Sequence, residues 1–560
     1  MRIVIFHYHL LPGGVTGVIE HTTRALHQFS SVVDSIEIVA GSRENIEQVS
    51  TEATVTVLPE IGYISTQRLA EYAPVPAGDH SDAAEGGPLG RVKESDVAAG
   101  ADVLAQRISR TLYQRWGGDS VWWVHNYHLG KNPAFTRALL EIAETHPDQH
   151  ILLHIHDFPE CGRYANLRYL RRAGVTNLYP TLPNLTYLTI NSRDREYLLN
   201  ADVTPVHYLP NPVPLPTKQP ADRAPRDVRS RLAHRFDTQF ARFRPDDLLL
   251  LYPVRTIRRK NIFEAALITM ELSKPTSLVV TLPGVSQAEK QYSQMVQHAF
   301  EDGTIPGLWG IGSHLDEVGL TFEDVQHTAD AIISTSVQEG FGYQFIDPLV
   351  HGTPLVARRL PVLRDVEDLY QEWPHAFYGQ ILVPNHSPSL SGPQALLRFR
   401  YTERIDRLAP HIPADIVAQL HQDVAEMVES ETIDFSFLLP QMQYTYLRDV
   451  QEYATFRQEI RSLNEDLFRQ IEGALHRRPT GSHPGVNERF GLAGFARRAD
   501  AILTGEAPAP QTARRESTSV PSGAAPSGAG PSGAGPRDLT PTDRMVAAFS
   551  HLDYQRLLYE

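Results

Sequence analysis

The sequence has one cysteine, Cys161, no long apolar run and no surplus of positive charge. A single cysteine excludes an intramolecular disulfide and a zinc site made of several thiolates, and it is usual in a reducing compartment. The longest apolar runs, such as Leu248–Leu251 and Leu278–Leu282, fall far short of the roughly 18 residues of a membrane span. Met1–Phe6 is apolar but short and has no small-residue cleavage site, so it predicts a first strand and not a signal peptide. We therefore expect a cytoplasmic protein without an integral membrane segment.

The charge balance is acidic, with Lys+Arg 52 against Asp+Glu 66 and a net charge of −14. This balance argues against a protein that coats nucleic acid, although a local basic pocket is compatible with it. Hydrophobic residues make up 41% of the chain, which is a globular composition. At roughly 100–200 residues per domain, 560 residues suggest two to four domains.

Short β-branched runs alternate with helical patterns along most of the chain, which is typical of βαβ units with parallel sheets. In the first half, Ile3–Phe6 predicts a strand and Val15–Phe29 a helix. The other strands expected there are Ile36–Ala40, Thr54–Leu58, Ser120–His125, Ile151–His156, Leu185–Ile190 and His207–Leu209. These runs predict a first domain over residues 1–215.

A polar, proline-rich stretch after Asn211 precedes a second alternating set, which predicts a second domain over 216–395. Its expected strands are Leu248–Val254, Ser277–Leu282, Leu308–Ile311, Ala331–Thr335 and Leu355–Ala357. Two successive doubly wound α/β domains predict a cleft between them, where ligands bind in such folds.

The C-terminal part has a different pattern. Residues 396–478 predict a helical extension, in which Phe456–Leu475 forms one amphipathic helix. Residues 479–543 predict a flexible linker, because Pro521–Pro536 repeats Pro-Ser-Gly-Ala. Within it, Arg489–Leu503 is amphipathic, which favours a packed surface helix over a membrane contact. Residues 544–560 predict a short terminal helix that docks on its own body or on a partner.

Three strings carry candidate chemistry, and the first is Pro12-Gly13-Gly14-Val15, between a strand and a helix. Glycines allow close backbone approach, and a helix N-terminus attracts an anion. The alternative is a turn needed only for geometry.

The second string, Arg255–Asn261, contains Arg255 and Lys260 directly after a strand. Carboxyl ends of strands bind ligands in open α/β sheets, and these two cations can hold a diphosphate from two sides. The alternative is a solvated basic turn.

The third string runs from Ser334 to Asp347 and places Glu339 in a glycine-flanked loop before a helix. Carboxylates accept hydrogen bonds from sugar hydroxyls, while the amides at a helix N-terminus bind phosphate. The alternative is an exposed acid or a helix cap.

Together the strings resemble the retaining, nucleotide-sugar-dependent glycosyltransferases of the GT-B fold, family 4, over residues 1 to about 450. The matching elements are Gly13-Gly14, His156-Asp157, Ser192, Asn211-Pro212-Val213, the Arg-x4-Lys pair Arg255 and Lys260, and the Glu-x7-Glu motif at Glu339–Asp347. The fold class that this implies is α/β, GT-B, with two Rossmann-like domains that face a cleft, followed by the helical extension and a disordered tail.

The resemblance implies a role for each matching residue. Arg255 and Lys260 would neutralise the donor diphosphate, and Glu339 would bind the donor sugar. His156 would lie near that sugar, and Gly14 near the leaving phosphate or the acceptor. Donor contacts are further implied for Gly340, Phe341, Gly342 and Asp347. Such enzymes need no metal and no cofactor besides the donor.

One position departs from the family, because Asp347 stands where the motif has Glu. Asp is one methylene shorter, and we expect it still to bind the ribose, with an altered nucleotide fit. The alternative is that Asp347 has become a helix-surface residue.

The histidines of the first half suggest a second relative. His125-Asn126-Tyr127-His128-Leu129 resembles an element of the trehalose-phosphate synthases, which have Asp at the position of Asn126. The spacing could also suggest zinc, but we expect no metal, because these histidines are predicted on separate strand ends. Candidate acceptor residues are His125, Asn126, Lys131, Asp157 and Arg163.

The predicted function is transfer of a hexose from a nucleoside diphosphate sugar to an acceptor hydroxyl with retention, by front-side displacement. The absence of an evident carboxylate pair disfavours a glycosidase-like double displacement. Three alternatives stay open, namely a trehalose-phosphate-synthase-like transferase, a nucleotide-sugar epimerase, and a degenerate scaffold that binds nucleotide or glycan. The partners implied are a small-molecule donor and a hydroxyl acceptor, without nucleic acid.

Overall fold

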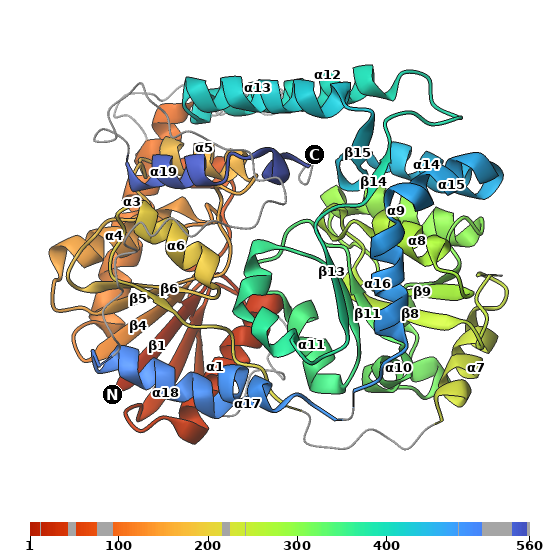
Figure 1. The fold of residues 1–560 in the computed structure, drawn as a ribbon. Coiled ribbons are helices and arrows are strands. Elements are labelled where there is room, and N and C mark those ends of the chain that lie inside the picture. The colour runs from red at the N-terminus through yellow and green to blue at the C-terminus, as the bar shows by residue number, and fades with distance from the viewer. Residues whose placement is uncertain are drawn as a thin grey trace, which may run out of the picture. The chain divides into compact units, whose positions relative to one another are not determined.

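A computed structural model describes residues 1–11, 13–42, 52–74, 93–215, 224–240, 242–479, 481–506 and 540–556. The chain folds into two compact units (Figure 1). Unit 1 contains residues 1–214, 411–415 and 490–549, and unit 2 contains residues 215–410, 416–489 and 550–560.

Unit 1 is built on a seven-stranded, fully parallel sheet with the order β3-β2-β1-β4-β5-β6-β7. The strands are β1 Arg2–His7, β2 Ser35–Ala40, β3 Thr54–Val57, β4 Ser120–His125, β5 Ile151–Ile155, β6 Leu185–Thr189 and β7 Val206–Tyr208. The central strands β1, β4 and β5 are buried along most of their length, so both faces must be covered by other elements. The helices are α1 Gly14–Phe29, α2 Thr66–Ala70, α3 Glu94–Trp116, α4 Pro133–Thr145, α5 Tyr164–Arg172, α6 Ser192–Asn200, α18 Leu492–Leu503 and α19 Pro541–Ala548, with a 3-10 turn, η2, at Pro59–Ile61.

Unit 2 is built on a six-stranded parallel sheet with the order β10-β9-β8-β11-β12-β13. Its strands are β8 Leu248–Arg255, β9 Thr276–Leu282, β10 Gly307–Trp309, β11 Ala331–Ser334, β12 Leu355–Arg358 and β13 His375–Tyr378; β14 Leu382–Pro384 and β15 Thr432–Asp434 form an antiparallel pair. The helices are α7 Pro225–Phe236, α8 Ile262–Glu271, α9 Gln287–Glu301, α10 Phe322–Thr328, α11 Tyr343–His351, α12 Pro393–Leu408, α13 Ala414–Glu429, α14 Pro440–Glu452, α15 Ala454–Leu463, α16 Glu465–Leu475 and α17 Pro484–Phe490. The 3-10 turns are η3 Arg258–Lys260, η4 Ile311–Ser313, η5 Asp316–Val318, η6 Pro361–Asp365, η7 Glu367–Tyr370, η8 Ala409–His411, η9 Phe435–Phe437 and η10 Leu552–Gln555.

These two sheets confirm the predicted fold class of two doubly wound, Rossmann-like α/β units of the GT-B-like kind. In both sheets the strand order reverses direction beside the first strand of the unit, between β1 and β4 and between β8 and β11. In open α/β sheets the carboxyl ends of the strands on either side of such a switch point form the ligand site. Topology therefore selects four loops, which follow β1, β4, β8 and β11.

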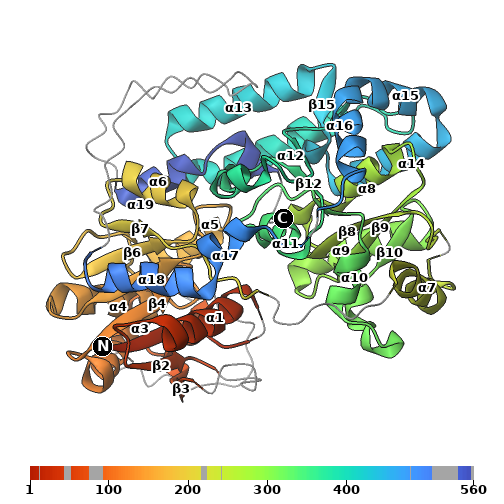
Figure 2. The ribbon, with the colours of Figure 1, turned by 60° about the horizontal axis from the view of Figure 1, so that its bottom comes forward.

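The linker prediction is wrong at α17 and α18, whereas the packed helix expected over Arg489–Leu503 is confirmed by α18. Helix α18 packs along α1, as Figure 2 shows, and Phe495 stacks on Trp123 of the sheet at a centroid distance of 6.3 Å. Burial of Phe495 and Ala499 explains why this segment is ordered, since a short amphipathic helix is stabilised mainly by packing. The repeat at Pro521–Pro536 lies outside the described residues.

The single helix predicted over Phe456–Leu475 is divided at Asn464 into α15 and α16. The Asn464 side chain accepts a hydrogen bond from the Leu382 amide at 2.9 Å and donates one to the Leu382 carbonyl at 2.7 Å. The side chain thus bonds to the backbone beside β14, which accounts for the break in the predicted helix.

The last described residues carry helix α19 and the turn η10. Helix α19 packs on unit 1, where Asp543 pairs with Arg171 and the Phe549 ring lies 5.2 Å from that of Phe158. Within unit 2, Arg556 donates to Ser436 Oγ at 3.0 Å.

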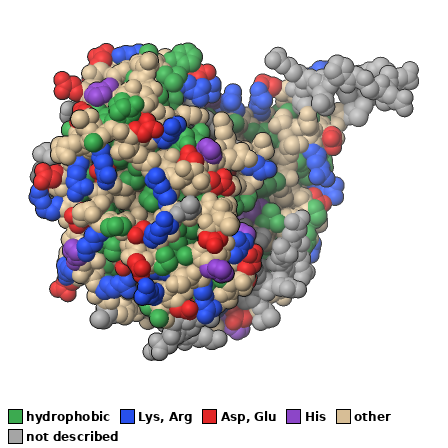
Figure 3. Space-filling view, turned by 90° about the vertical axis from the view of Figure 1, so that its right-hand side faces the viewer, with side chains coloured by type: hydrophobic (Ala, Val, Ile, Leu, Met, Phe, Trp, Pro, Cys, Tyr) green, Lys and Arg blue, Asp and Glu red, His purple; other side chains and the backbone are tan. Residues whose placement is uncertain are grey.

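No helix within the described ranges is both long and apolar enough to cross a membrane. On the face in Figure 3, the basic and acidic side chains of the described residues are interspersed and do not separate into areas of one sign.

Candidate functional site

The sequence-predicted site residues lie in both units, at the carboxyl ends of the strands or in the loops and helix that follow them. In unit 2 a cluster joins the loop after β8 with the loop after β11. The Lys260 ammonium forms an ion pair with Glu339, and Arg259 Nη1 lies 3.2 Å from the other carboxylate oxygen of Glu339. Both Lys260 and Glu339 are buried. The carboxylate of the third string is thus placed against the cations of the second.

Backbone hydrogen bonds hold these two loops together. The Val337 amide donates to the Arg259 carbonyl at 2.9 Å, and Thr335 Oγ1 donates to the Asn261 carbonyl at 2.9 Å. The Tyr252 hydroxyl, from within β8, donates to the Lys260 carbonyl at 2.7 Å. Since Tyr252 is buried in the sheet, it anchors the basic loop to the core, and the position of Lys260 is set by the fold.

The electrostatics keep the cluster ionised near neutral pH. Burial opposes the charge of Glu339, but Lys260 and Arg259 outweigh it and hold the pKa of this carboxyl below its usual value. Burial lowers the pKa of Lys260 to about 8, and the Glu339 charge acts against that shift. The site therefore presents a dense positive charge that a single buried carboxylate balances in part.

The four cations of the basic loop have different roles. Arg255 is about half exposed, and its Nη1 lies 3.9 Å from Glu289. Arg258 instead points into the core, where Nη2 donates to the carbonyls of Ser436 and Leu438 at 3.0 and 3.1 Å. Arg258 is therefore a structural residue, and Arg259, which sequence reasoning overlooked, belongs to the site. The only sequence signal for Arg259 was its place within a run of three cations.

The glycine-flanked loop continues into α11, which begins at Tyr343. Gly342 has a φ of +81° at the N-cap, and a Cβ there would lie 2.5 Å from the Phe345 ring. Both facts require glycine at this position. Glu339, Gly340 and Phe341 precede this helix N-terminus, which favours an anion in front of it.

Asp347 lies on α11, and its carboxylate is half-buried. Within the described parts of the chain, no hydrogen bond or ion pair to Asp347 is found. Burial raises its pKa to about 7. A carboxylate that is partly desolvated but lacks a donor can accept hydrogen bonds from a ligand.

In unit 1, α1 begins at Gly14, at the end of the glycine loop. A Cβ on Gly14 would meet no atom of the described residues within 4 Å, so the space beside it is open on their side. His9, nearer to β1, accepts a hydrogen bond from the Leu11 amide on Nδ1 at 3.1 Å and thereby shapes this loop.

The histidines of β4 and β5 lie side by side, because His125 and His154 are register partners in the parallel pair. His125 and His154 are thus on separate strands, as expected, but these strands are neighbours, so their separation in the sequence does not keep the imidazoles apart. His125 Nδ1 lies 2.8 Å from His156 Nε2, and the nitrogens of His125, His154 and His156 all lie within 4.8 Å of one another. Burial lowers the pKa of all three, so they are neutral imidazoles near pH 7.

The other candidates of unit 1 lie in the loops that follow β4 and β5. Asn126, with a φ of +54°, accepts a hydrogen bond from the His156 amide at 2.9 Å. Asp157 forms an ion pair with Arg163. The Lys131 ammonium lies 5.3 Å above the ring of Tyr63, and burial, with Arg163 nearby, lowers its pKa.

The fold of two parallel, Rossmann-like sheets is similar to that of the glycosyltransferases with a GT-B-like fold. No protein-family model matches the chain. A curated relative, "Mannosylglucosyl-3-phosphoglycerate synthase" of Petrotoga mobilis, is 29% identical over 487 residues, which cover 84% of this chain and 85% of the relative.

Solved structures that are similar to this chain over most of its length include those of a sucrose-phosphate synthase and of HepE. Sucrose-phosphate synthase of Thermosynechococcus elongatus has a TM-score of 0.45 and 11% identity over 90% of this chain and 98% of its own. Anabaena HepE has a TM-score of 0.46 and 12% identity over 90% of this chain and 100% of its own.

Proposed function

We propose that this chain is a retaining hexosyltransferase of family 4, which transfers a hexose from a nucleoside diphosphate sugar to an acceptor hydroxyl. The observation that carries the proposal is the buried cluster of Lys260, Arg259 and Glu339 at the switch point of unit 2. Cations there would bind the donor diphosphate, and the carboxylate would accept hydrogen bonds from the hexose hydroxyls.

The donor would be bound by residues of unit 2. Lys260, Arg255 and Arg259 would stabilise the charge that develops on the diphosphate as the bond to the sugar breaks. Asp347 would accept hydrogen bonds from the ribose, which would supply the donors that it lacks. With the cations in this role, the reaction would need no metal and no cofactor.

The acceptor would be bound by unit 1, near Gly14, His156 and Lys131. The Petrotoga relative is named for a product that carries mannosyl and glucosyl groups on 3-phosphoglycerate. We propose an acceptor of the same chemical kind for this chain, a hexoside with an acidic group. Its hydroxyl would attack the anomeric carbon on the face that the diphosphate leaves, and the departing phosphate would take the proton.

The test is thermal stabilisation of the full chain by UDP, GDP and ADP and by their hexose derivatives, measured with and without EDTA. Stabilisation by one nucleotide family, followed by acceptor-dependent release of that nucleoside diphosphate, is the expected result. Binding without turnover on any acceptor would favour the degenerate scaffold, and an epimerised sugar formed without acceptor would favour the epimerase. Loss of all stabilisation in EDTA would overturn metal independence.

Nucleotide affinity should first rise and then fall as the pH increases, which gives a rising and a falling limb. Asp347, whose pKa is raised to about 7, must ionise to accept two ribose hydroxyls, so affinity for a nucleoside diphosphate hexose, whose esterified phosphates do not titrate in this range, should rise between about pH 6 and 7. Lys260, whose pKa is lowered to about 8, loses its charge above that pH, so affinity should then fall. Titration calorimetry at several pH values measures both limbs.

Asp347→Asn should remove the rising limb and leave the falling limb in place. A 2′,3′-dideoxy nucleotide is the matched ligand control, since it should lack the rising limb with wild-type protein as well. A rising limb that persists in Asp347→Asn would exclude Asp347 from the ribose site.

Gly14→Ala should reduce transfer on the order of tenfold or more without loss of stability. A methyl group at this position meets no atom of the described residues, so any obstruction would fall on the ligand. Gly17→Ala, one turn further along α1 and equally open, is the matched control. Steady-state kinetics on both variants, with melting temperatures, check the prediction, and equal activities would contradict it.

A further inference from the structure

Unit 1 contains a cavity of about 490 Å³ that the proposed acceptor residues do not account for. It lies at the carboxyl ends of β1 and β2, next to the glycine loop, and its volume falls within the roughly 300–1,000 Å³ of small-molecule sites. The cavity is lined by Tyr8, His9, Leu11, Gly41, Ser42, Pro59, Glu60, Gly62, Tyr63, Ile64, Arg68, Tyr72 and Leu104.

We propose that this cavity binds the anionic end of a glycosylated acceptor, with Arg68 and Tyr63 as the groups that recognise the negative charge. The inference rests on the proposed function and assigns a specificity site to it. The anion can be a phosphate or a carboxylate, since both accept hydrogen bonds from a guanidinium fork and a phenol.

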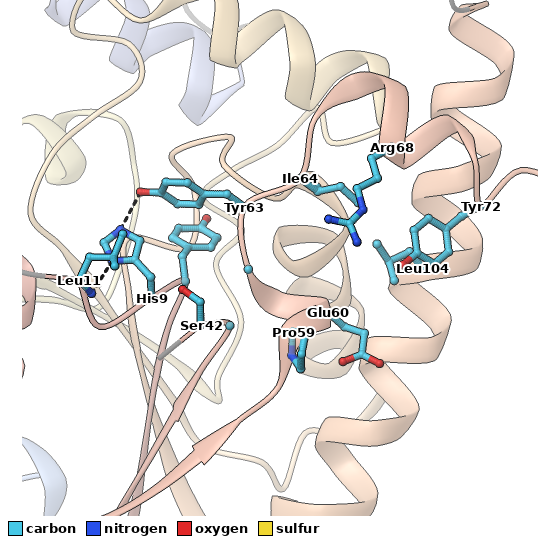
Figure 4. Close-up of a pocket in the computed structure, with 13 residues that line it drawn as sticks. His9, Leu11, Ser42, Pro59, Glu60, Tyr63, Ile64, Arg68, Tyr72 and Leu104 are labelled. Carbon is cyan, nitrogen blue, oxygen red and sulfur yellow. Dashed lines mark hydrogen bonds between the residues drawn. The ribbon is translucent and has the colours of Figure 1, made fainter. Parts of the chain in front are cut away.

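Arg68 supplies the positive charge. Figure 4 shows its side chain directed into the cavity between Tyr63 and Tyr72. Across the residues that the structure describes, no hydrogen bond or ion pair of the Arg68 guanidinium is found. Glu60, the acidic residue of the wall, is already paired with Arg107 at 2.9 Å. A ligand anion would therefore meet a cation whose charge no described residue neutralises.

Tyr63 supplies a hydrogen-bond donor, and the direction of its bond to His9 follows from the neighbours. The Leu11 amide donates to His9 Nδ1, so this nitrogen carries no proton. Burial, with Lys131 nearby, lowers the pKa of His9 and keeps its ring neutral. His9 Nε2 must then carry the proton and donate to the Tyr63 oxygen at 3.0 Å (Figure 4). The hydroxyl hydrogen of Tyr63 is left to donate to a ligand.

The same hydrogen bonds connect the cavity to the glycine loop. His9 contacts Tyr63 on one side and the Leu11 amide on the other, two residues before Gly13. The rings of Tyr63 and Tyr72 give the cavity aromatic walls, on which the apolar face of a sugar can lie. An acceptor with its charged end at Arg68 would thus extend along Tyr63 toward Gly14.

The experiment measures binding of glucosyl-3-phosphoglycerate, glucosylglycerate and methyl glucoside to the full chain by calorimetry. We expect Arg68→Gln to weaken binding of glucosyl-3-phosphoglycerate about tenfold. Binding of glucosylglycerate should weaken less, and binding of methyl glucoside hardly at all. Glu60→Gln should tighten binding of the two anionic ligands, since it removes the negative charge of the Glu60 side chain from the cavity wall. The control is Arg110→Gln, an exposed arginine of α3 that does not line the cavity.

Separate readouts distinguish the two proposals. If the nucleotide binds and transfer proceeds, but Arg68→Gln and Arg110→Gln bind the anions equally well, the cavity assignment is overturned and the proposed function stands. If anion binding depends on Arg68 while no nucleotide stabilises the chain, the anion site stands and the transferase proposal fails. Loss of the ion pair in Arg68→Gln should also appear as a reduced dependence of binding on salt.

Discussion

Lys260→Met should lose nearly all affinity for a nucleoside diphosphate and retain the affinity for the nucleoside alone. The substitution keeps the length of the side chain and removes only the buried charge. Loss of a charge-assisted contact to the diphosphate in such a site corresponds to about 2–4 kcal/mol, or a roughly 30- to 1,000-fold weaker complex. Transfer should fall by at least the same factor, because the charge on the leaving diphosphate is greatest in the transition state.

The fold should tolerate Lys260→Met, because Glu339 keeps Arg259 as a partner at 3.2 Å. Calorimetry with the nucleoside, its monophosphate and its diphosphate on the variant measures the effect. Lys290→Met, an exposed lysine on α9, is the matched control and should behave as wild type. Equal weakening of nucleoside and diphosphate in Lys260→Met would show a loss of structure and would remove Lys260 from the diphosphate site.

Glu339→Gln should have the opposite pattern, with transfer reduced on the order of 100- to 1,000-fold and diphosphate binding unchanged or tighter. In the structure, the Glu339 carboxylate occupies Lys260 and Arg259. Without its charge, both cations remain for the phosphates, while the hexose loses a charged acceptor of its hydroxyl hydrogens.

Glu339→Gln must be compared with wild type below neutral pH. Without the carboxylate, burial lowers the pKa of Lys260 further, and the ammonium must stay protonated for the comparison to hold. The measurement pairs single-turnover transfer with diphosphate binding. Loss of both by similar factors would assign Glu339 a structural role, and unchanged transfer would exclude it from the sugar site.

The proximity of Lys260 and Glu339 could be predicted from the sequence, because both follow strands that short continuous apolar runs predict. The strand β8 and the loop after β11 could be located from Leu248–Val254 and Ala331–Thr335 alone, and the switch point then brings their ends together. Arg259 could not be assigned in this way. Three consecutive cations look equivalent in a sequence, and only the path of η3 directs Arg258 into the core and Arg259 to Glu339.

The histidine cluster and the cavity, like the role of Arg259, could not be predicted from the sequence. Strand register makes His125 and His154 neighbours although 28 residues separate them, and register depends on which strands pair. The segment between β3 and α3, a loop and a short helix, contains Tyr63, Arg68 and Tyr72. No hydrophobic periodicity there predicts that these side chains line a cavity. Helix α18 was placed within an expected linker because the neighbouring composition is polar, and its order comes from the partner surface on α1.

The sequence by itself therefore determined the α/β class, the two doubly wound sheets, and the strand ends that bear Gly14, Lys260 and Glu339. These depend on local patterns of apolar residues and on the handedness of βαβ units. Only the tertiary structure decided which cation meets Glu339, how the three imidazoles associate, and where the cavity beside Arg68 opens. Those features depend on side chains brought together from distant segments, and the free energy of their contacts has no local signature in the sequence.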